Sequence, residues 1–177
     1  MSPDMQTARL RLRLVNDADF PDLLRGLNDW RVARNISPIP FPYHEADALA
    51  YFPTLQRRAL EGSGYCWTIN EGTFVGIVAV DFEAQQGELG YWLMPDAWGK
   101  GYATEAARCV ADFAFGDTEC AKLVANHAAD NPASGRVLMK LGFVETNRGE
   151  SYYTSRQMMV SRIGLELTRE RWQALRS

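Results

Sequence analysis

Hydrophobic and polar positions alternate strictly near the start of the chain, where residues 9–14 place leucines on one side and arginines on the other. A period of two predicts a half-buried strand. Asn16 and Asp17 then offer N-caps for a helix that runs through Leu27 on its apolar positions. A short helical turn is expected around residues 30–34.

The middle of the chain predicts one helix and three consecutive strands. Residues 36–44 carry three prolines and are expected to form a loop, and a helix follows over residues 45–60. Three runs rich in aromatic and β-branched residues come next, separated by short turn sequences that favour antiparallel hairpins. These runs are residues 65–70, 73–82 and 88–93. Gly90 inside the last run indicates a bulge or a close approach by another backbone.

The last third of the chain alternates helices and strands. Apolar positions at helical spacing begin at Ala103, and Gly116 is expected to end that helix. A second helix is expected from Pro132 to Leu141, with Asn131 as N-cap and Gly142 as the stop. The remaining expected elements are a strand over 122–127, a strand over 143–146, a polar loop through 151, a strand ending at 167 and a helix over 169–175. The order predicts a mixed α+β domain with a mostly antiparallel central sheet flanked by helices.

Composition narrows the class of protein. With 177 residues, 46% hydrophobic and 23% charged, the chain fits one globular domain over residues 1–177. A net charge of −3 offers no basic face for nucleic acid. The sequence shows no apolar run near the roughly 18 residues that cross a bilayer, and no signal-peptide core. Three cysteines at unrelated spacings show neither a disulfide framework nor a metal-binding pair. We expect a cytoplasmic protein with no metal, nucleic-acid or membrane partner.

One stretch carries candidate chemistry: residues 94–107 read MPDAWGKGYATEAA and pass from a proline loop through two glycines into a helix. Backbone N–H groups at a helix start have no internal partner and attract phosphate oxygens. Glycines allow a close approach and a positive φ. The alternative is that Gly99 and Gly101 only shape a connection. The spacing matches neither a P-loop nor a dinucleotide fingerprint, because Met94 and Thr104 stand where those motifs need small residues.

The segment from Trp98 to Ala103 does resemble the acyl-CoA signature Q/R-x-x-G-x-G/A of the GNAT N-acetyltransferases. Trp98 stands where glutamine or arginine is typical. Four stretches resemble the RimJ/RimL-like branch (ribosomal-protein N-terminal acetyltransferase type) of that superfamily, in the same order and over nearly the whole chain. They are TARLRLRLVNDADF, GELGYWLMPDAWGKGYATEAA, NPASGRVLMKLGFVE and LTRERW. The resemblance implies the GNAT (acyl-CoA N-acyltransferase) fold and acetyl-CoA as co-substrate.

The resemblance also implies a set of acetyl-CoA contacts. The backbone of Tyr91, Trp92 and Leu93 pairs with pantetheine, and Asn131 contacts the same arm. Thr104 adds its hydroxyl to the amides that bind the pyrophosphate. The whole predicted turn comprises Trp98, Gly99, Lys100, Gly101, Tyr102, Ala103 and Thr104.

Two candidates emerge for proton transfer at the thioester. Glu88 begins the strand that leads to the glycine turn, and the similar family position has a base role; the alternative is a solvated strand-end carboxylate. Many GNAT enzymes protonate the thiolate with a tyrosine, but Leu138 occupies that place here. RimJ/RimL-like proteins use a serine, which Ser134 matches, although a polar residue in the first turn of a helix is the competing reading. His44 and His127 are further base candidates.

The acceptor pocket is predicted from aromatic side chains, each of which could equally belong to the hydrophobic core. The candidates are Trp30, Phe41, Tyr43, His44, Tyr91, Tyr152 and Tyr153. The sequence therefore predicts an N-acetyltransferase that moves an acetyl group directly to a primary amine, either a protein N-terminus or a small amine. The alternative from another class is a domain that binds acyl-CoA as a sensor without turnover. Homodimers are common among similar proteins, and the letters leave the oligomeric state open.

Overall fold

The protein is built on one mixed sheet, seen in a computed structural model that describes residues 4–176. Within these residues the strand order is β1-β2-β3-β4-β5-β6-β8-β7, and every neighbouring pair is antiparallel except β5 and β6. The α+β class with a mostly antiparallel sheet is thus confirmed. The strands are β1 Met5–Gln6, β2 Arg11–Leu14, β3 Gly64–Glu71, β4 Thr73–Glu83, β5 Gln86–Leu93, β6 Lys122–Ala128, β7 Val144–Tyr153 and β8 Met158–Thr168.

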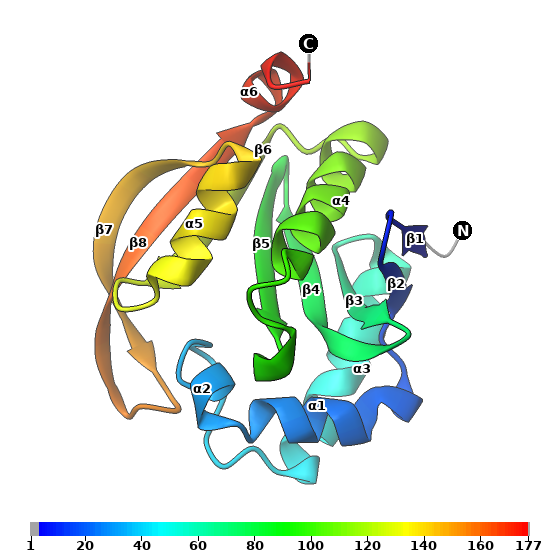
Figure 1. Ribbon diagram of the computed structural model, residues 1–177, viewed down its shortest axis with the longest axis vertical. Coiled ribbons are helices and arrows are strands. Elements are labelled where there is room, and N and C mark those ends of the chain that lie inside the picture. The colour runs from blue at the N-terminus through cyan, green and yellow to red at the C-terminus, as the bar shows by residue number, and fades with distance from the viewer. Residues whose placement is uncertain (1–3, 177) are drawn as a thin grey trace.

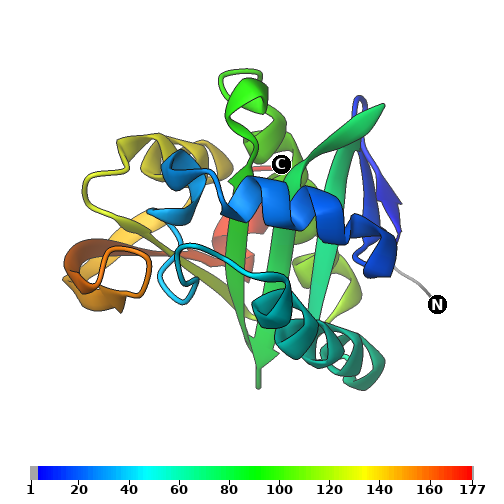
Figure 2. The ribbon, with the colours of Figure 1, turned by 90° about the horizontal axis from the view of Figure 1, so that it is seen from below.

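Helices cover both faces of this sheet (Figure 1). Seen from below, α4 and α5 lie on one face and α3 on the other, while α1 crosses the ends of the strands (Figure 2). The helices are α1 Phe20–Leu27, α2 Trp30–Ala33, α3 Glu45–Glu61, α4 Tyr102–Asp117, α5 Pro132–Leu141 and α6 Arg169–Ala174, with 3-10 turns at Asp17–Asp19 and Pro95–Ala97. Among the helices of the described chain, none is long and apolar enough to cross a membrane.

The main core lies between the sheet and α4. Trp67 of β3, Val110 and Phe115 of α4 are fully buried there, and the Trp67 ring meets the edge of Phe113 at 5.6 Å between centroids. Because apolar burial stabilises by about 25 cal/mol per Å², this cluster fixes α4 against the strands. The start of α4 is therefore a rigid edge beside β5.

Local predictions hold best where capping residues mark an end. The helix over residues 132–141 is found with the predicted bounds, with Asn131 as N-cap and Gly142 in the left-handed conformation (φ +98°). The three central strands are also present, each within two residues of its predicted ends. Asn16 caps the 3-10 turn before α1, and α2 forms the predicted short turn.

Two of the predicted element boundaries are wrong. The polar segment through residue 151 is not a loop, because β7 runs over Val144–Tyr153 and pairs with β8 along its length. Its side chains are almost all exposed at the edge of the sheet, so the apolar alternation that signals a strand is missing. Gly116 does not end its helix, since α4 continues to Asp117.

Gly90 lies in regular register opposite Ala79, without a bulge. An added Cβ there would meet no atom within 4 Å, so the residue faces open space rather than a neighbouring strand.

Candidate active site

A cleft opens where β5 and β6 stop pairing. Their parallel ladder covers only the pairs that begin at Gln86 and end at Glu88 opposite Val124. Beyond Glu88 the two strands separate (Figure 1), and a cavity of about 1270 Å³ occupies the space. Its walls come from the rest of β5, the glycine turn, the first turns of α5 and the loop after α2. Backbone groups of β5 that would face β6 in a continued sheet therefore lie beside a cavity.

The glycine turn closes one end of this cleft. Gly99 and Gly101 both take the left-handed conformation, with φ of +77° and +83°. Gly101 is the N-cap of α4 and has no side chain that could bond to the first backbone amides of the helix. Without such a capping bond, these amides can bind an anion. The indole nitrogen of Trp98 donates to the carbonyl oxygen of Leu93 at 2.9 Å and ties the turn to the end of β5.

Arg9, from the start of the chain, contacts the same glycine turn. The Arg9 guanidinium donates to the carbonyl oxygen of Lys100 at 3.0 Å and pairs with the carboxylate of Glu105 at 2.6 Å. Burial acts to raise the pKa of Glu105, but hydrogen bonds from Thr7 and Arg9 outweigh it and leave that pKa below its usual value. Arg9 thus neutralises a carboxylate in the first turn of α4.

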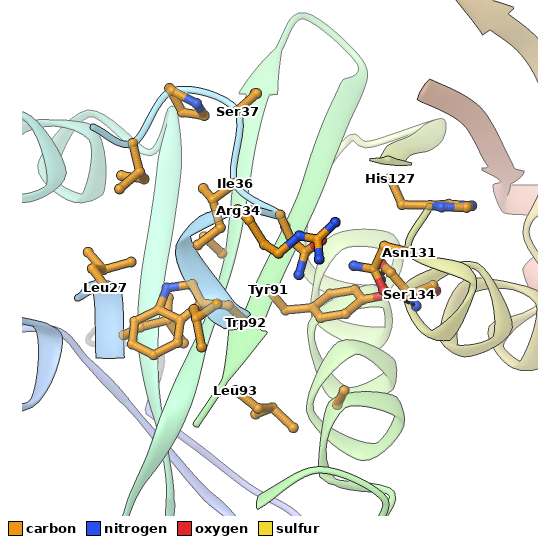
Figure 3. Close-up of a pocket in the computed structure, with 18 of the residues that line it drawn as sticks. Leu27, Arg34, Ile36, Ser37, Tyr91, Trp92, Leu93, His127, Asn131 and Ser134 are labelled. Carbon is orange, nitrogen blue, oxygen red and sulfur yellow. Dashed lines mark hydrogen bonds between the residues drawn. The ribbon is translucent and has the colours of Figure 1, made fainter. Parts of the chain in front are cut away.

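Tyr91 and Ser134 meet across the cleft. The phenolic oxygen of Tyr91 lies 3.0 Å from the hydroxyl oxygen of Ser134 and 3.1 Å from its carbonyl oxygen (Figure 3). The backbone N–H of Ser134 in turn donates to Asn131 at 3.4 Å, as the capping geometry of α5 requires. Burial raises the pKa of Tyr91 to about 12, so the phenol keeps its proton at neutral pH.

Glu88 stands at the mouth of the cleft, on the last residue pair of the β5–β6 ladder. Its side chain is exposed, and its carboxylate accepts a hydrogen bond from the Asn126 amide at 3.1 Å. The carboxylate therefore faces solvent and the cavity at once.

The wall opposite α5 is formed by α2 and the proline loop. Trp30 and Tyr43 both line it. The turn between β7 and β8 holds this wall in place through three contacts. They are Thr154 N to Ser37 O at 2.9 Å, Ser155 Oγ to Ala33 O at 2.9 Å and Arg156 Nε to Arg34 O at 2.6 Å.

Most residues predicted for the site share this one cavity. Those in its wall are Glu88, Tyr91, Trp92, Leu93, Trp98, Gly99, Gly101, Tyr102, Ala103, Thr104, Asn131, Ser134, Trp30, Tyr43, Tyr153 and His127. His127 is buried, and its Nδ1 lies 2.8 Å from the carbonyl oxygen of Ala128.

Four predicted residues do not line the cavity: Lys100, Phe41, His44 and Tyr152. Lys100 is exposed to solvent. Phe41 packs edge-on against Trp30, with 5.1 Å between ring centroids. His44 precedes α3, where its backbone N–H donates to Asp47 at 2.7 Å. Neighbouring residues of a strand point to opposite faces, so Tyr153 is buried while Tyr152 is exposed.

Sequence reasoning missed a charged cluster in the same wall. The carboxylate of Asp130 accepts hydrogen bonds from Arg34 at 2.8 Å and from both terminal nitrogens of Arg156 at 2.8 and 3.0 Å. These residues are far apart along the chain, and only the fold brings them together. The signal available beforehand was one arginine, Arg34, two residues before the proline loop.

The residues present fit a thioester of a nucleotide carrier. Open space surrounds the Cβ positions of Gly90 and Gly99, so a ligand backbone can approach both β5 and the turn. The family described as the acetyltransferase (GNAT) domain matches residues 9–144. The chain belongs to the GNAT acetyltransferase family. Its activity is accordingly that of an acetyl-CoA-dependent N-acetyltransferase.

Individual relatives and solved structures are similar to this chain over most of its length. The uncharacterized N-acetyltransferase YoaA of Bacillus subtilis is 28% identical over 150 residues, which cover 81% of this chain and 84% of that protein. RimJ of Mycobacterium smegmatis, solved in complex with CoA-disulfide, superposes with a TM-score of 0.79 at 20% identity and covers 94% of this chain and 88% of that one.

Spermidine N-acetyltransferase of Vibrio cholerae, solved in complex with CoA and spermine, gives a TM-score of 0.79 at 16% identity, covering 94% and 99% of the two chains. Both structural matches show that this GNAT chain shares their fold, and the GNAT fold class is confirmed.

Proposed function

We propose that this acetyltransferase moves an acetyl group from acetyl-CoA directly to a primary amine within the β5–β6 cleft. The observation that carries the proposal is the contact between Tyr91 and Ser134, which places two hydroxyl groups on the cavity wall beside an unpaired stretch of β5. Catalysis of acyl transfer needs a positioned carbonyl and a proton for the leaving group. In this proposal the unpaired edge of β5 positions the thioester carbonyl, and the hydroxyl pair supplies the proton for the leaving group.

The glycine turn and β5 bind the carrier in this proposal. The amides at the start of α4 take the diphosphate, favoured by the positive end of the helix dipole. The backbone of Tyr91, Trp92 and Leu93 continues the sheet by pairing with the pantetheine arm, and Asn131 contacts the same arm. The thioester then lies between Tyr91 and the start of α5.

Two side chains transfer protons in this proposal: Glu88 acts at the acceptor amine, and Ser134 acts at the leaving sulfur. An ammonium acceptor gives one proton to Glu88 through water and becomes a neutral amine. The amine nitrogen forms a bond to the acetyl carbon, and the carbon–sulfur bond breaks. Sulfur takes a proton through the hydroxyl of Ser134, which recovers one from the acylated nitrogen. For an α-amine with a pKa of about 7.7–8.0 the first step is inexpensive at neutral pH.

A covalent acetyl-cysteine route is disfavoured by the state of the thiols. Cys66 is the cysteine in the wall of the cavity, and burial raises its pKa to about 12. The nucleophilic form of cysteine is the thiolate, which such a pKa suppresses at neutral pH.

The acceptor class follows from two kinds of relatives. Structures with this fold include a ribosomal-protein-S5-alanine acetyltransferase and a spermidine N-acetyltransferase, both from Vibrio species. We accordingly take the acceptor to be a protein N-terminal amine or a small amine.

Release of CoA thiol across a panel of small amines and N-terminal peptides tests this function. We expect turnover with at least one class. Glu88→Gln should lower kcat only about ten-fold, because an α-amine with a pKa of about 7.7–8.0 is already partly neutral at pH 7, while CoA affinity stays unchanged. Glu83→Gln, at the end of the neighbouring strand and outside the cavity wall, serves as the matched control. Tight CoA binding without thiol release from any amine would show a non-catalytic acyl-CoA-binding domain instead.

A further inference from the structure

A charged cluster at the cavity wall near Ser134 carries one positive charge in excess, and two of its members, Arg34 and Asp130, line the cavity. Arg34, Arg156 and Asp130 form a cluster of two cations and one anion. Arg156 binds the carboxylate of Asp130 with two nitrogens and donates its third to the carbonyl oxygen of Arg34. Each of the three guanidinium nitrogens of Arg156 therefore makes a hydrogen bond, and Asp130 is neutralised without Arg34.

Arg34 is the partly engaged member of this cluster. Within the part of the chain that the structure describes, its guanidinium makes a single hydrogen bond, to Asp130 at 2.8 Å. The pKa of Asp130 lies below its usual value mainly because of the hydrogen bond from Arg156, with Arg34 contributing less. A guanidinium has five N–H donors, so Arg34 keeps donors for another anion.

The N–H donors that Arg34 keeps for another anion lie beside the reacting centre. Its partner Asp130 directly precedes Asn131, which caps the turn that contains Ser134. Figure 3 shows the Arg34 side chain reaching from the end of α2 toward Tyr91 and Asn131. The turn between β7 and β8 fixes the backbone of Arg34, so the side chain is directed from a rigid wall.

The same wall offers an apolar surface next to the charge. Leu27, Ile36 and Trp92 line the cavity on the side of Arg34 away from Ser134 (Figure 3). An acceptor with one anionic group and one apolar group matches this combination, whereas a polyamine would bring a second cation against Arg34.

We infer that Arg34 selects an acceptor amine that carries a carboxylate a few bonds from the nitrogen. This specificity rests on the proposed function, because it assumes that the amine reacts beside Ser134. Arg34 pairs with the carboxylate and orients the amine toward the thioester. The carboxylate comes either from a small amino acid or from an acidic residue near a protein N-terminus.

Matched acceptor pairs test this inference. Each pair is a free amino acid and the amide of the same amino acid, and kcat/KM is measured by CoA thiol release. The α-amine of an amide is the weaker base and is more often neutral at pH 7.5, so chemistry alone favours the amide. We expect the wild-type enzyme to prefer the free acid at least ten-fold.

Two arginine variants separate the inferred role from a general charge effect. Arg34→Met should abolish the preference, chiefly by raising KM for the acid, and Arg34→Lys should keep part of it. Arg31→Met is the control, because Arg31 lies one turn away in the same cavity wall and its guanidinium is already paired with Asp29. Arg31→Met should leave the acid preference intact. CoA affinity measured by calorimetry confirms that each variant is folded.

The outcomes distinguish a failure of the Arg34 role from a failure of the proposed function. Turnover with equal or better use of the amides, or loss of the preference in Arg31→Met as well, overturns the role of Arg34 alone. No CoA binding and no turnover with any acceptor overturns the proposed function and this inference together. Two further tripeptides, one acidic and one neutral at the second position, identify the source of the carboxylate: preference for the acidic peptide over free acids assigns it to a protein N-terminus.

Discussion

The phenolic oxygen of Tyr91 lies 3.0 Å from the hydroxyl oxygen of Ser134, and this contact joins β5 to the first turn of α5 across an open cleft. The contact depends on two structural features. The β5–β6 ladder ends at Glu88, which separates the strands, and Asn131 caps α5 so that Ser134 faces β5. A hydroxyl pair is thus fixed at the point where the sheet opens.

Removing the Ser134 hydroxyl should slow the chemical step. We expect Ser134→Ala to lower kcat by about 100-fold or more, the effect of losing one proton-transfer group, with little change in CoA affinity. Tyr91→Phe should have a smaller effect on kcat, because the phenol acts through Ser134. Steady-state kinetics with calorimetric CoA titration measures both quantities. A Ser134→Ala enzyme with wild-type kcat would remove Ser134 from the mechanism.

The raised pKa of Tyr91 predicts a loss of stability at alkaline pH. The phenol titrates near 10.0 in the unfolded chain and at about 12 in the folded protein. Its contribution is therefore complete below pH 10 and is lost as the pH rises toward 12. We expect the free energy of unfolding of the wild type to fall by up to about 2 kcal/mol more than that of Tyr91→Phe over this range. Denaturant titrations of the two proteins measure the difference, and parallel pH curves would contradict the assignment.

The fold was predictable from local signals wherever a cap or a clear period marked an element. Asn131, Pro132 and Gly142 give the helix α5 its predicted bounds. The edge strand β7 was predicted only over its first residues, because the exposed side chains that follow carry no alternation, and only pairing with β8 makes them part of the strand. Local sequence therefore determines ends of elements better than it determines edge strands.

The site was predictable to a different extent. The glycine turn follows from spacing and resemblance, because it lies within one short segment. The cluster of Arg34, Asp130 and Arg156 joins three distant segments through ion pairs, which no local pattern reports. Tyr152 and Tyr153 show a second limit, since a shift of one position on a strand decides which of them faces the cavity.

A side chain at Gly101 should abolish CoA binding. We expect Gly101→Glu to weaken CoA affinity by about 100-fold or more, because it places a like charge beside the diphosphate at the helix start. Gly72→Glu is the matched control. Gly72 has a similar φ of +71° in the turn between β3 and β4, and its Cβ position is open, so the backbone strain is comparable. Calorimetry should show normal affinity for Gly72→Glu; equal losses in both variants would point to strain rather than to the anion site.

The pair of Arg9 and Glu105 should tune the same site. In Arg9→Met the Glu105 carboxylate loses its cation and repels the diphosphate, so we expect CoA affinity to fall about five-fold to ten-fold. Adding Glu105→Gln removes the repelling charge and should restore most of the affinity. A double-mutant cycle of CoA dissociation constants measures this coupling. Additive effects of the two substitutions would contradict it.

Hydrogen–deuterium exchange with and without CoA reports on the very backbone amides that the proposal assigns to the carrier. Binding should slow exchange at residues 99–104 of the glycine turn and at residues 91–93 of β5, while the remote turn around residue 72 is unchanged. Saturating CoA that binds and yet leaves both segments exchanging at their free rates would contradict the assignment of the β5–β6 cleft as the acetyl-CoA site.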